Sequence, residues 1–70
     1  MEDIYIGDIW QHYKGGRYII IGFGVHTETE EKMVIYSPLT DRDKVWIRPL
    51  SMWFDVIDKE KNIIRFKREK

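Results

Sequence analysis

Trp46 and Arg48 are the residues whose types and spacing best suit a chemical task. They lie two positions apart in an apolar run, so in an extended strand both side chains point to the same face. A guanidinium is a planar fork of donors that suits a carboxylate or phosphate, and an indole beside it can stack on a planar ligand. The pair therefore indicates an anion site. Two other interpretations stay open: an internal salt bridge from Arg48 to Glu28 or an aspartate, and a Trp46 ring that only fills the mouth of the fold.

The histidines provide a weaker signal. His12 and His26 are the only two, there is no cysteine, and their spacing is not that of metal ligands, so we expect no metal and no cofactor. His26 and Glu28 could form a hydrogen-bonded pair near a strand end and act as a general base. Neither Ser37 nor Ser51 has the surroundings of an activated nucleophile. We therefore expect a binding protein rather than an enzyme.

The segment 12–16 places a cation, an aromatic ring and flexible backbone in one turn. Tyr13 and Lys14 could contact a phosphate there together with backbone N–H groups, although the spacing is not that of a P-loop. A plain hairpin turn explains the same residues, because the pair Gly15-Gly16 permits positive φ angles.

Short strands separated by turn residues must position these side chains. The expected strands cover residues 8–13, 18–26, 32–36, 45–48, 54–57 and 63–67, with one helical turn near 50–53. No segment keeps a helical period over ten residues or more. Five to six short antiparallel strands predict an all-β fold in the form of a small barrel. The 70 residues form a single domain, with a core over about 8–66 and a basic tail at 67–70.

The expected strand over 18–26 has two glycines at alternate positions. Alternation assigns one face to the core and leaves the other face with Tyr18, Ile20, Gly22, Gly24 and His26. The glycines either let the strand coil sharply, as small barrels require, or floor a groove with Tyr18 and His26 near its ends. The face assigned to the core consists of Ile19, Ile21, Phe23 and Val25.

Charge is balanced overall and uneven along the chain. Lys plus Arg and Asp plus Glu each number 12; residues 59–70 contain six basic and two acidic side chains, which leaves residues 1–58 with six basic and ten acidic ones. Zero net charge disfavours nucleic-acid binding, because such affinity rests mainly on neutralising phosphates, and only the basic segment favours it. No apolar run approaches about 18 residues and the acidic start lacks signal-peptide features, so we expect a cytoplasmic protein with no membrane partner.

Several motifs occur in the order found in a known family. They are His12-Tyr13-Lys14-Gly15 followed by Tyr18, His26-Thr27-Glu28-Thr29, Val34-Ile35-Tyr36, Trp46-Ile47-Arg48-Pro49-Leu50-Ser51-Met52 and Arg65-Phe66. On these motifs the chain resembles the bacterial DUF1653 family from about Asp8 to Phe66. The resemblance implies an SH3-like β-barrel. It implies no function, because the family has no established one.

Together these residues predict a small non-enzymatic domain that binds or sequesters a small anionic, nucleotide-like ligand. The expected contacts are Trp46, Arg48, His26, Tyr18, Lys14, Tyr13 and Glu28. This hypothesis requires Arg48, His26 and Lys14 to converge around a cavity.

The alternative is a peptide- or protein-interaction module with an exposed aromatic groove. Its rings would be Trp10, Tyr13, Trp46 and Trp53, and its rim would hold acids such as Asp41, Asp43 and Glu30. For either function, so short a chain buries a small core and gains from association, so a homo-oligomer is also expected.

Overall fold

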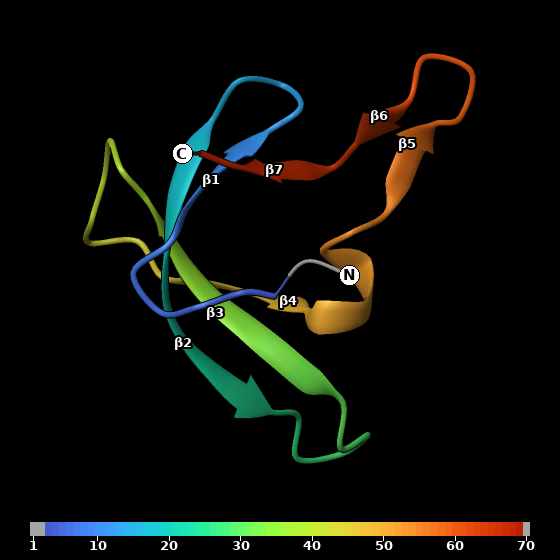
Figure 1. Ribbon diagram of the computed structural model, residues 1–70. Helices are drawn as coiled ribbons and strands as arrows, with labels where there is room; N and C mark the ends of the chain where they lie inside the picture. The colour runs from blue at the N-terminus through green and yellow to red at the C-terminus, as the bar shows by residue number, and fades with distance from the viewer. Residues whose placement is uncertain (1–2, 70) are drawn as a thin grey trace.

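Seven short strands and one 3₁₀ turn form the fold in a computed structural model that describes residues 3–69 (Figure 1). Five strands form one antiparallel sheet in the order β4-β3-β2-β1-β7, and β5 pairs with β6 in a separate hairpin. The predicted all-β fold of short antiparallel strands is confirmed, although the sheet curls without closing into a barrel. The elements are β1 (Ile9–His12), β2 (Arg17–Val25), β3 (Lys32–Pro38), β4 (Trp46–Pro49), η1 (Leu50–Met52), β5 (Val56–Asp58), β6 (Ile63–Ile64) and β7 (Phe66–Arg68).

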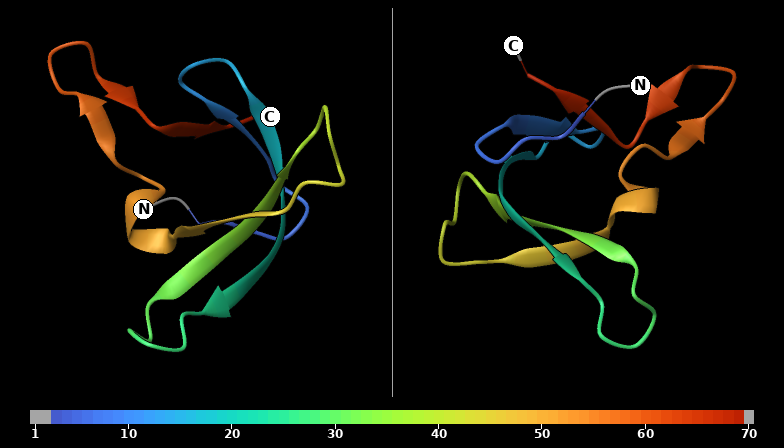
Figure 2. Two further views of the ribbon diagram at one scale, coloured as in Figure 1. Left: turned by 180° about the vertical axis from the view of Figure 1, so that it is seen from behind. Right: turned by 60° about the horizontal axis from the view of Figure 1, so that its bottom comes forward.

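The strand expected over 63–67 is divided at Arg65. The Arg65 N–H donates to the Asp55 carbonyl at 2.8 Å, and the Arg65 carbonyl accepts the Tyr13 N–H at 2.9 Å. Arg65 therefore bonds to two different parts of the chain, and here the backbone leaves the β5–β6 hairpin to pair with β1. Figure 2 shows the hairpin projecting from the main sheet in both views.

The basic segment after Phe66 belongs largely to the sheet. Lys67 and Arg68 lie in β7 opposite Gln11 and Trp10 of β1, and the Glu69 N–H donates to the Ile9 carbonyl at 2.8 Å. These residues are therefore an edge strand rather than the expected tail; Lys70 lies outside the described residues.

A β-bulge in β2 changes which side chains face the core. Ile20 pairs with Tyr36 of β3, but the next pair joins Gly22 to Ile35, so Ile21 is the extra residue. Directly paired residues share a face of the sheet, and one inserted residue moves every later side chain to the other face.

The assignment of Ile19, Ile21, Phe23 and Val25 to one core face is wrong, because Ile19 pairs with Ser37 on the side away from Tyr36 and Ile21 is the extra residue of the bulge. Ile20, from the opposite set, is buried, whereas Phe23 and Val25 are 44% and 63% exposed near the far end of the hairpin. Phe23 does share a face with buried Val34, but it lies where little covers the sheet.

The bulge also separates Tyr18 from the two glycines of β2. Tyr18 pairs with Pro38 on the core side, whereas Gly22 and Gly24 pair on the other side with Ile35 and Met33. The glycines therefore do not floor a groove that has Tyr18 at its end. A Cβ on Gly22 would meet no atom within 4 Å, so no close approach requires a glycine there.

The core is mainly aromatic. Trp53 follows η1, and its ring stacks on Phe66 with centroids 3.8 Å apart and planes 7° apart. Trp10 meets Trp53 edge to face at 5.9 Å, and both indoles are fully buried. Neither tryptophan can therefore line the exposed groove of the alternative hypothesis. The buried cluster consists of Trp10, Ile20, Val34, Tyr36, Trp53 and Phe66.

Candidate functional site

Arg48 lies among aromatic rings on the concave face of the sheet. Its Nε donates to the Tyr36 hydroxyl at 3.2 Å, and its guanidinium carbon is 5.7 Å from the Phe66 ring centroid. Arg48 forms no ion pair with an aspartate or glutamate within residues 3–69. The internal salt bridge to Glu28 or an aspartate is thus not formed in the described chain. The guanidinium keeps donors that an external anion could use.

Trp46 lies on the same face, two residues before Arg48. The β4 register places Trp46 opposite Tyr36 and Arg48 opposite Val34, and both partners belong to the core. The Trp46 ring packs against Tyr18 with centroids 5.5 Å apart and planes 41° apart. Trp46 is nevertheless 41% exposed. The indole therefore packs on one side and leaves surface on which a planar group could stack.

The turn between β1 and β2 lies against the Tyr18 ring and leaves room for it. A Cβ on Gly16 would lie 2.7 Å from the Tyr18 hydroxyl oxygen and 3.0 Å from its Cε2, so a side chain at this position would displace the ring. The preceding Gly15 has a φ of +107°, which L side chains rarely adopt. The Gly-Gly pair is thus the predicted hairpin turn, and Gly16 leaves the space that the Tyr18 ring occupies.

His12, which the sequence did not assign to the site, lies beside it, next to Phe66. The centroid of its ring is 5.0 Å from that of Phe66, which it meets edge to face, and 4.5 Å from that of Tyr13. Its Nδ1 accepts the Lys14 N–H at 3.2 Å. The signal that could have found it is spacing, because His12 lies two positions after the core residue Trp10 and so shares its face.

The surroundings of His12 are positively charged. Burial lowers the pKa of the imidazole, and the charges of Arg48, Arg65 and Lys14 lower it further. These cations come from β4, from the junction of β6 and β7 and from the β1–β2 turn, so three separate segments bring positive charge to one end of the sheet. Arg65 is partly neutralised by Asp55, whose Oδ2 lies 3.3 Å from its Nη2.

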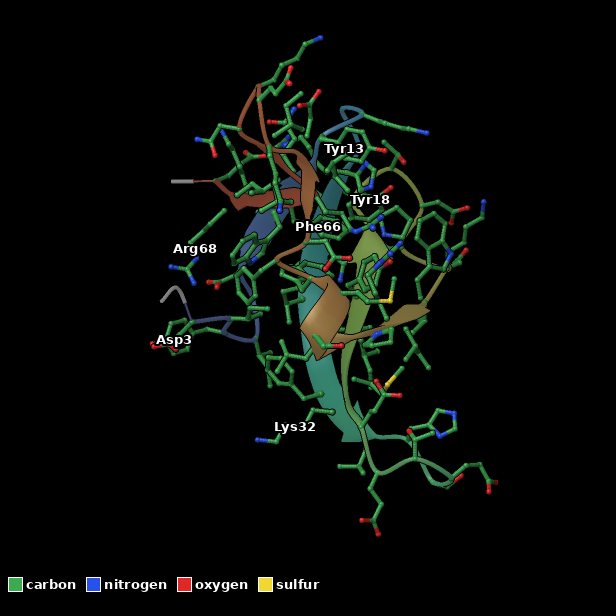
Figure 3. All side chains as sticks on the ribbon, turned by 90° about the vertical axis from the view of Figure 1, so that its right-hand side faces the viewer. Asp3, Tyr13, Tyr18, Lys32, Phe66 and Arg68 are labelled. Carbon is green, nitrogen blue, oxygen red and sulfur yellow. The ribbon has the colours of Figure 1, made fainter. Side chains whose placement is uncertain are left out.

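A cleft of about 370 Å³ opens beside His12, between the β1–β2 turn and the β5–β6 hairpin. Figure 3 shows Tyr13, on its wall, near Tyr18 and Phe66 at one end of the sheet, with Lys32 near the other. No Asp or Glu is among the lining residues. The residues that line the cleft are Gln11, His12, Tyr13, Lys61, Asn62, Ile63, Ile64 and Lys67.

His26 and Glu28 lie at the opposite end of the sheet. Eight residues of β-structure, at about 3.3 Å each, separate His26 from Tyr18 by roughly 25 Å. The His26 Nδ1 accepts the backbone N–H groups of Glu28 at 3.1 Å and Thr29 at 3.3 Å, so the imidazole stabilises its own loop. The expected convergence of His26 with Arg48 and Lys14 is therefore not observed. Of the seven predicted contacts, the structure gathers Trp46, Arg48, Tyr18, Tyr13 and Lys14 and leaves His26 and Glu28 apart.

The sequence model of a family described as "Protein of unknown function (DUF1653)" matches residues 8–68. The chain belongs to the DUF1653 family. The matched region includes every strand of residues 3–69. The Arg48 cluster, which consists of Arg48, Trp46, Tyr18, Tyr36 and Phe66, and the neighbouring cleft therefore both lie within the DUF1653 domain. No curated protein and no solved structure was found to be similar to it.

Two further features of the DUF1653 domain bear on its chemistry. In residues 3–69, no three His, Asp or Glu side chains are grouped so that they could hold a metal ion. Over the same residues, no helix has the length and apolar character needed to cross a bilayer.

Proposed function

We propose that this protein is a non-enzymatic domain that binds a small anionic, nucleotide-like ligand on the concave face of its sheet. The observation that carries the proposal is the environment of Arg48, whose guanidinium lies beside the Tyr36 hydroxyl and the Phe66 ring and forms no ion pair within residues 3–69. An anion that reaches Arg48 gains a charge-assisted hydrogen bond without displacing an internal carboxylate. Such a bond contributes about 1.5–3 kcal/mol.

The planar part of the ligand would stack on Trp46. The indole is 41% exposed and is held by contacts to Tyr18 and Tyr36, at centroid distances of 5.5 Å and 6.0 Å. A ring fixed in this way loses little conformational freedom on binding, and a base stacked on such a ring contributes about 1–3 kcal/mol. Trp46 and Arg48 point the same way from β4, so one ligand can contact both.

Side-chain placement also supports binding rather than catalysis. Ser37 is buried, and its Oγ donates to the Arg42 carbonyl at 3.4 Å, away from solvent. His26 holds its own loop, and His12 has a lowered pKa caused by burial and by neighbouring cations. None of these groups is arranged as a nucleophile activated by a base.

A peptide groove is the second candidate, and exposed rings favour it. Tyr13 and Trp46 are 42% and 41% exposed, so an extended peptide could lie across both. Trp10 and Trp53 are buried and cannot contribute. The groove would consist of fewer rings than the sequence predicts, which leaves the anionic ligand as the better-supported function.

Thermal unfolding with a panel of nucleotides and nucleotide derivatives tests the proposal. A ligand at about 100 times its Kd adds about 2.7 kcal/mol of stability and should raise the Tm by about 10 °C or more. Arg48→Gln should abolish the shift, whereas Arg42→Gln, on an exposed loop, should retain it. A panel that leaves the Tm unchanged would contradict the proposal, and capture of a proline-rich peptide would support the second candidate.

Native mass spectrometry of the freshly purified protein adds an independent measurement. A co-purifying small mass would give the ligand class directly. The same spectrum tests the homo-oligomer, which together with the cytoplasmic location stays a prediction.

A further inference from the structure

The cleft beside His12 has basic and amide side chains on its walls and no carboxylate. Lys61 comes from the loop between β5 and β6, and Lys67 comes from β7, so the two ammonium groups belong to different walls. Gln11 and Asn62 add amide donors. At about 370 Å³ the cleft falls within the size range of small-molecule sites, about 300–1,000 Å³.

The acids nearest in sequence form no ion pair with Lys61 or Lys67 within residues 3–69. Glu69, two residues after Lys67, pairs with Arg17. The Asp58 Oδ1 accepts the backbone N–H groups of Glu60 at 3.0 Å and Lys61 at 3.2 Å, so this carboxylate organises the hairpin loop. Asp55 pairs with Arg65. Lys61 and Lys67 take part in no ion pair within residues 3–69, and Glu60 is exposed and does not line the cleft.

The cleft and the Arg48 cluster share His12 as a boundary. His12 lines the cleft, and its ring lies 5.0 Å from Phe66, the ring that Arg48 covers at 5.7 Å. The Tyr13 ring is tilted by 32° to the His12 ring at a centroid distance of 4.5 Å and forms the next part of the same wall. The Lys14 ammonium is 5.9 Å from the centroid of the Tyr13 ring. Lys67 pairs with Gln11, next to the pair of Phe66 and His12, so these two cleft residues lie on the other face of the sheet from Arg48. A ligand held at Arg48 therefore reaches the cleft around the end of β1, past His12 and Tyr13.

We propose that this cleft is a phosphate subsite, so that the ligand is a nucleoside di- or triphosphate. The inference rests on the proposed function, since it assigns the remaining part of the same ligand. The base would stack on Trp46, the first phosphate would meet Arg48, and the later phosphates would turn around the end of β1 at His12 to reach Lys61 and Lys67. Lysine suits this position because its compact ammonium binds phosphate oxygens without a fixed orientation.

A free nucleotide is favoured over a nucleic-acid strand on charge. The chain has 12 basic and 12 acidic side chains, and strand binding depends on neutralising many phosphates at once. The cleft offers only Lys61 and Lys67 as cations on its walls, which matches a short phosphate chain.

Isothermal titration with matched probes tests the subsite. The probes are the 5′-mono- and triphosphates of adenosine and guanosine, inorganic tripolyphosphate and a short single-stranded oligonucleotide. The variants are Lys61→Gln/Lys67→Gln in the cleft, Arg48→Gln beside it, and Lys59→Gln as a control on the same hairpin but off the cleft wall. We expect a triphosphate to bind about tenfold or more tightly than its monophosphate, from the added charge-assisted contacts.

The double variant should reduce the affinity for the triphosphate to that for the monophosphate, leave the monophosphate affinity unchanged and abolish tripolyphosphate binding. Lys59→Gln should change none of these, and Arg48→Gln should weaken both nucleotides. The subsite would be overturned if the wild-type protein bound the mono- and triphosphate with equal affinity. It would also be overturned if the double variant bound the triphosphate as tightly as the wild type does.

The same titrations separate failure of the subsite from failure of the proposed function. Tripolyphosphate binding that depends on Lys61 and Lys67, without nucleotide binding, would support the cleft as a phosphate site and refute the stacking part of the proposed function. Nucleotides that bind through Arg48 regardless of the two lysines would refute only the subsite. An oligonucleotide that binds more tightly than the triphosphate, with steep salt dependence, would overturn the assignment to a free nucleotide.

Discussion

Arg48 and Phe66 bring together the two edge strands of an open sheet. Arg48 lies in β4 and Phe66 in β7, the first and last strands in the sheet order, and the guanidinium carbon is 5.7 Å from the centre of the ring. No backbone ladder joins these strands within residues 3–69, so side chains complete the curl that hydrogen bonds leave open. The same guanidinium is the proposed anion contact. Under the proposed function, one residue would therefore couple ligand binding to closure of the fold.

The first prediction concerns the planar form of the Arg48 side chain. Arg48→Lys keeps the charge and removes both the Nε bond to Tyr36 and the flat contact with Phe66. We expect a loss of about 0.5–2 kcal/mol in the free energy of unfolding, the range of a cation–π contact and a hydrogen bond of this kind. Nucleotide affinity should fall about tenfold or more with the loss of the fork. Urea unfolding and calorimetric titration measure the two effects; unchanged values for Arg48→Lys would mean that charge alone matters.

The positions of the strands along the chain were predictable because turn residues separate them. The expected strand at 45–48 is observed at Trp46–Pro49, and the one at 32–36 extends to Pro38. The shared face of Trp46 and Arg48 also followed from their spacing and is observed. These are local properties, since they depend on residues close together in the sequence.

The wrong core face of β2 and the missed role of His12 have a different cause, because both depend on contacts between residues far apart in the sequence. The bulge at Ile21 depends on how β2 pairs with β3, and alternation within β2 alone cannot reveal it. The place of His12 depends on the approach of Phe66, far away in sequence. The separation of His26 from Tyr18, by contrast, follows from the length of the expected strand, and the sequence already contained it.

The second prediction tests whether Gly16 is required to position Tyr18. Gly16→Ala places a methyl group 2.7 Å from the Tyr18 hydroxyl oxygen, so the ring must move. We expect a destabilisation of about 1–3 kcal/mol, typical of overpacking, together with weaker nucleotide binding. Gly22→Ala is the matched control, because its methyl group meets nothing within 4 Å and should change stability by less than about 1 kcal/mol in either direction. Equal effects of the two substitutions on unfolding would show that the contact with Tyr18 is unimportant.

The third prediction distinguishes a core role for Trp53 from a binding role. Its ring is buried and stacked on Phe66 at 3.8 Å. Trp53→Ala should cost about 3–5 kcal/mol, a large share of the stability of so small a domain, whereas Trp53→Phe keeps a stacked ring and should cost less. Circular dichroism during urea unfolding measures both. A Trp53→Phe variant that folds normally and has lost affinity for a ligand or peptide would contradict the core assignment.

The fourth prediction follows from the lowered pKa of His12. The unfolded chain carries an ordinary imidazole with a pKa near 6.5, and burial followed by the charges of Arg48, Arg65 and Lys14 lowers the pKa in the folded protein. Between the two pKa values the unfolded state binds more protons, so the free energy of unfolding falls as the pH drops through about 6.5 and levels off below the folded pKa. His12→Asn can still accept the Lys14 N–H and does not titrate, so urea unfolding from about pH 8 to about pH 5.5 should show the wild-type protein losing stability relative to this variant.

A bound phosphate should counter the cations and raise the pKa of His12, so nucleotide affinity should increase on acidification in the wild type and less in His12→Asn. A wild-type protein that gains stability relative to the variant at the lower pH would show that His12 accepts a proton more readily in the folded state, and the positive field assigned to this end of the sheet would then be wrong.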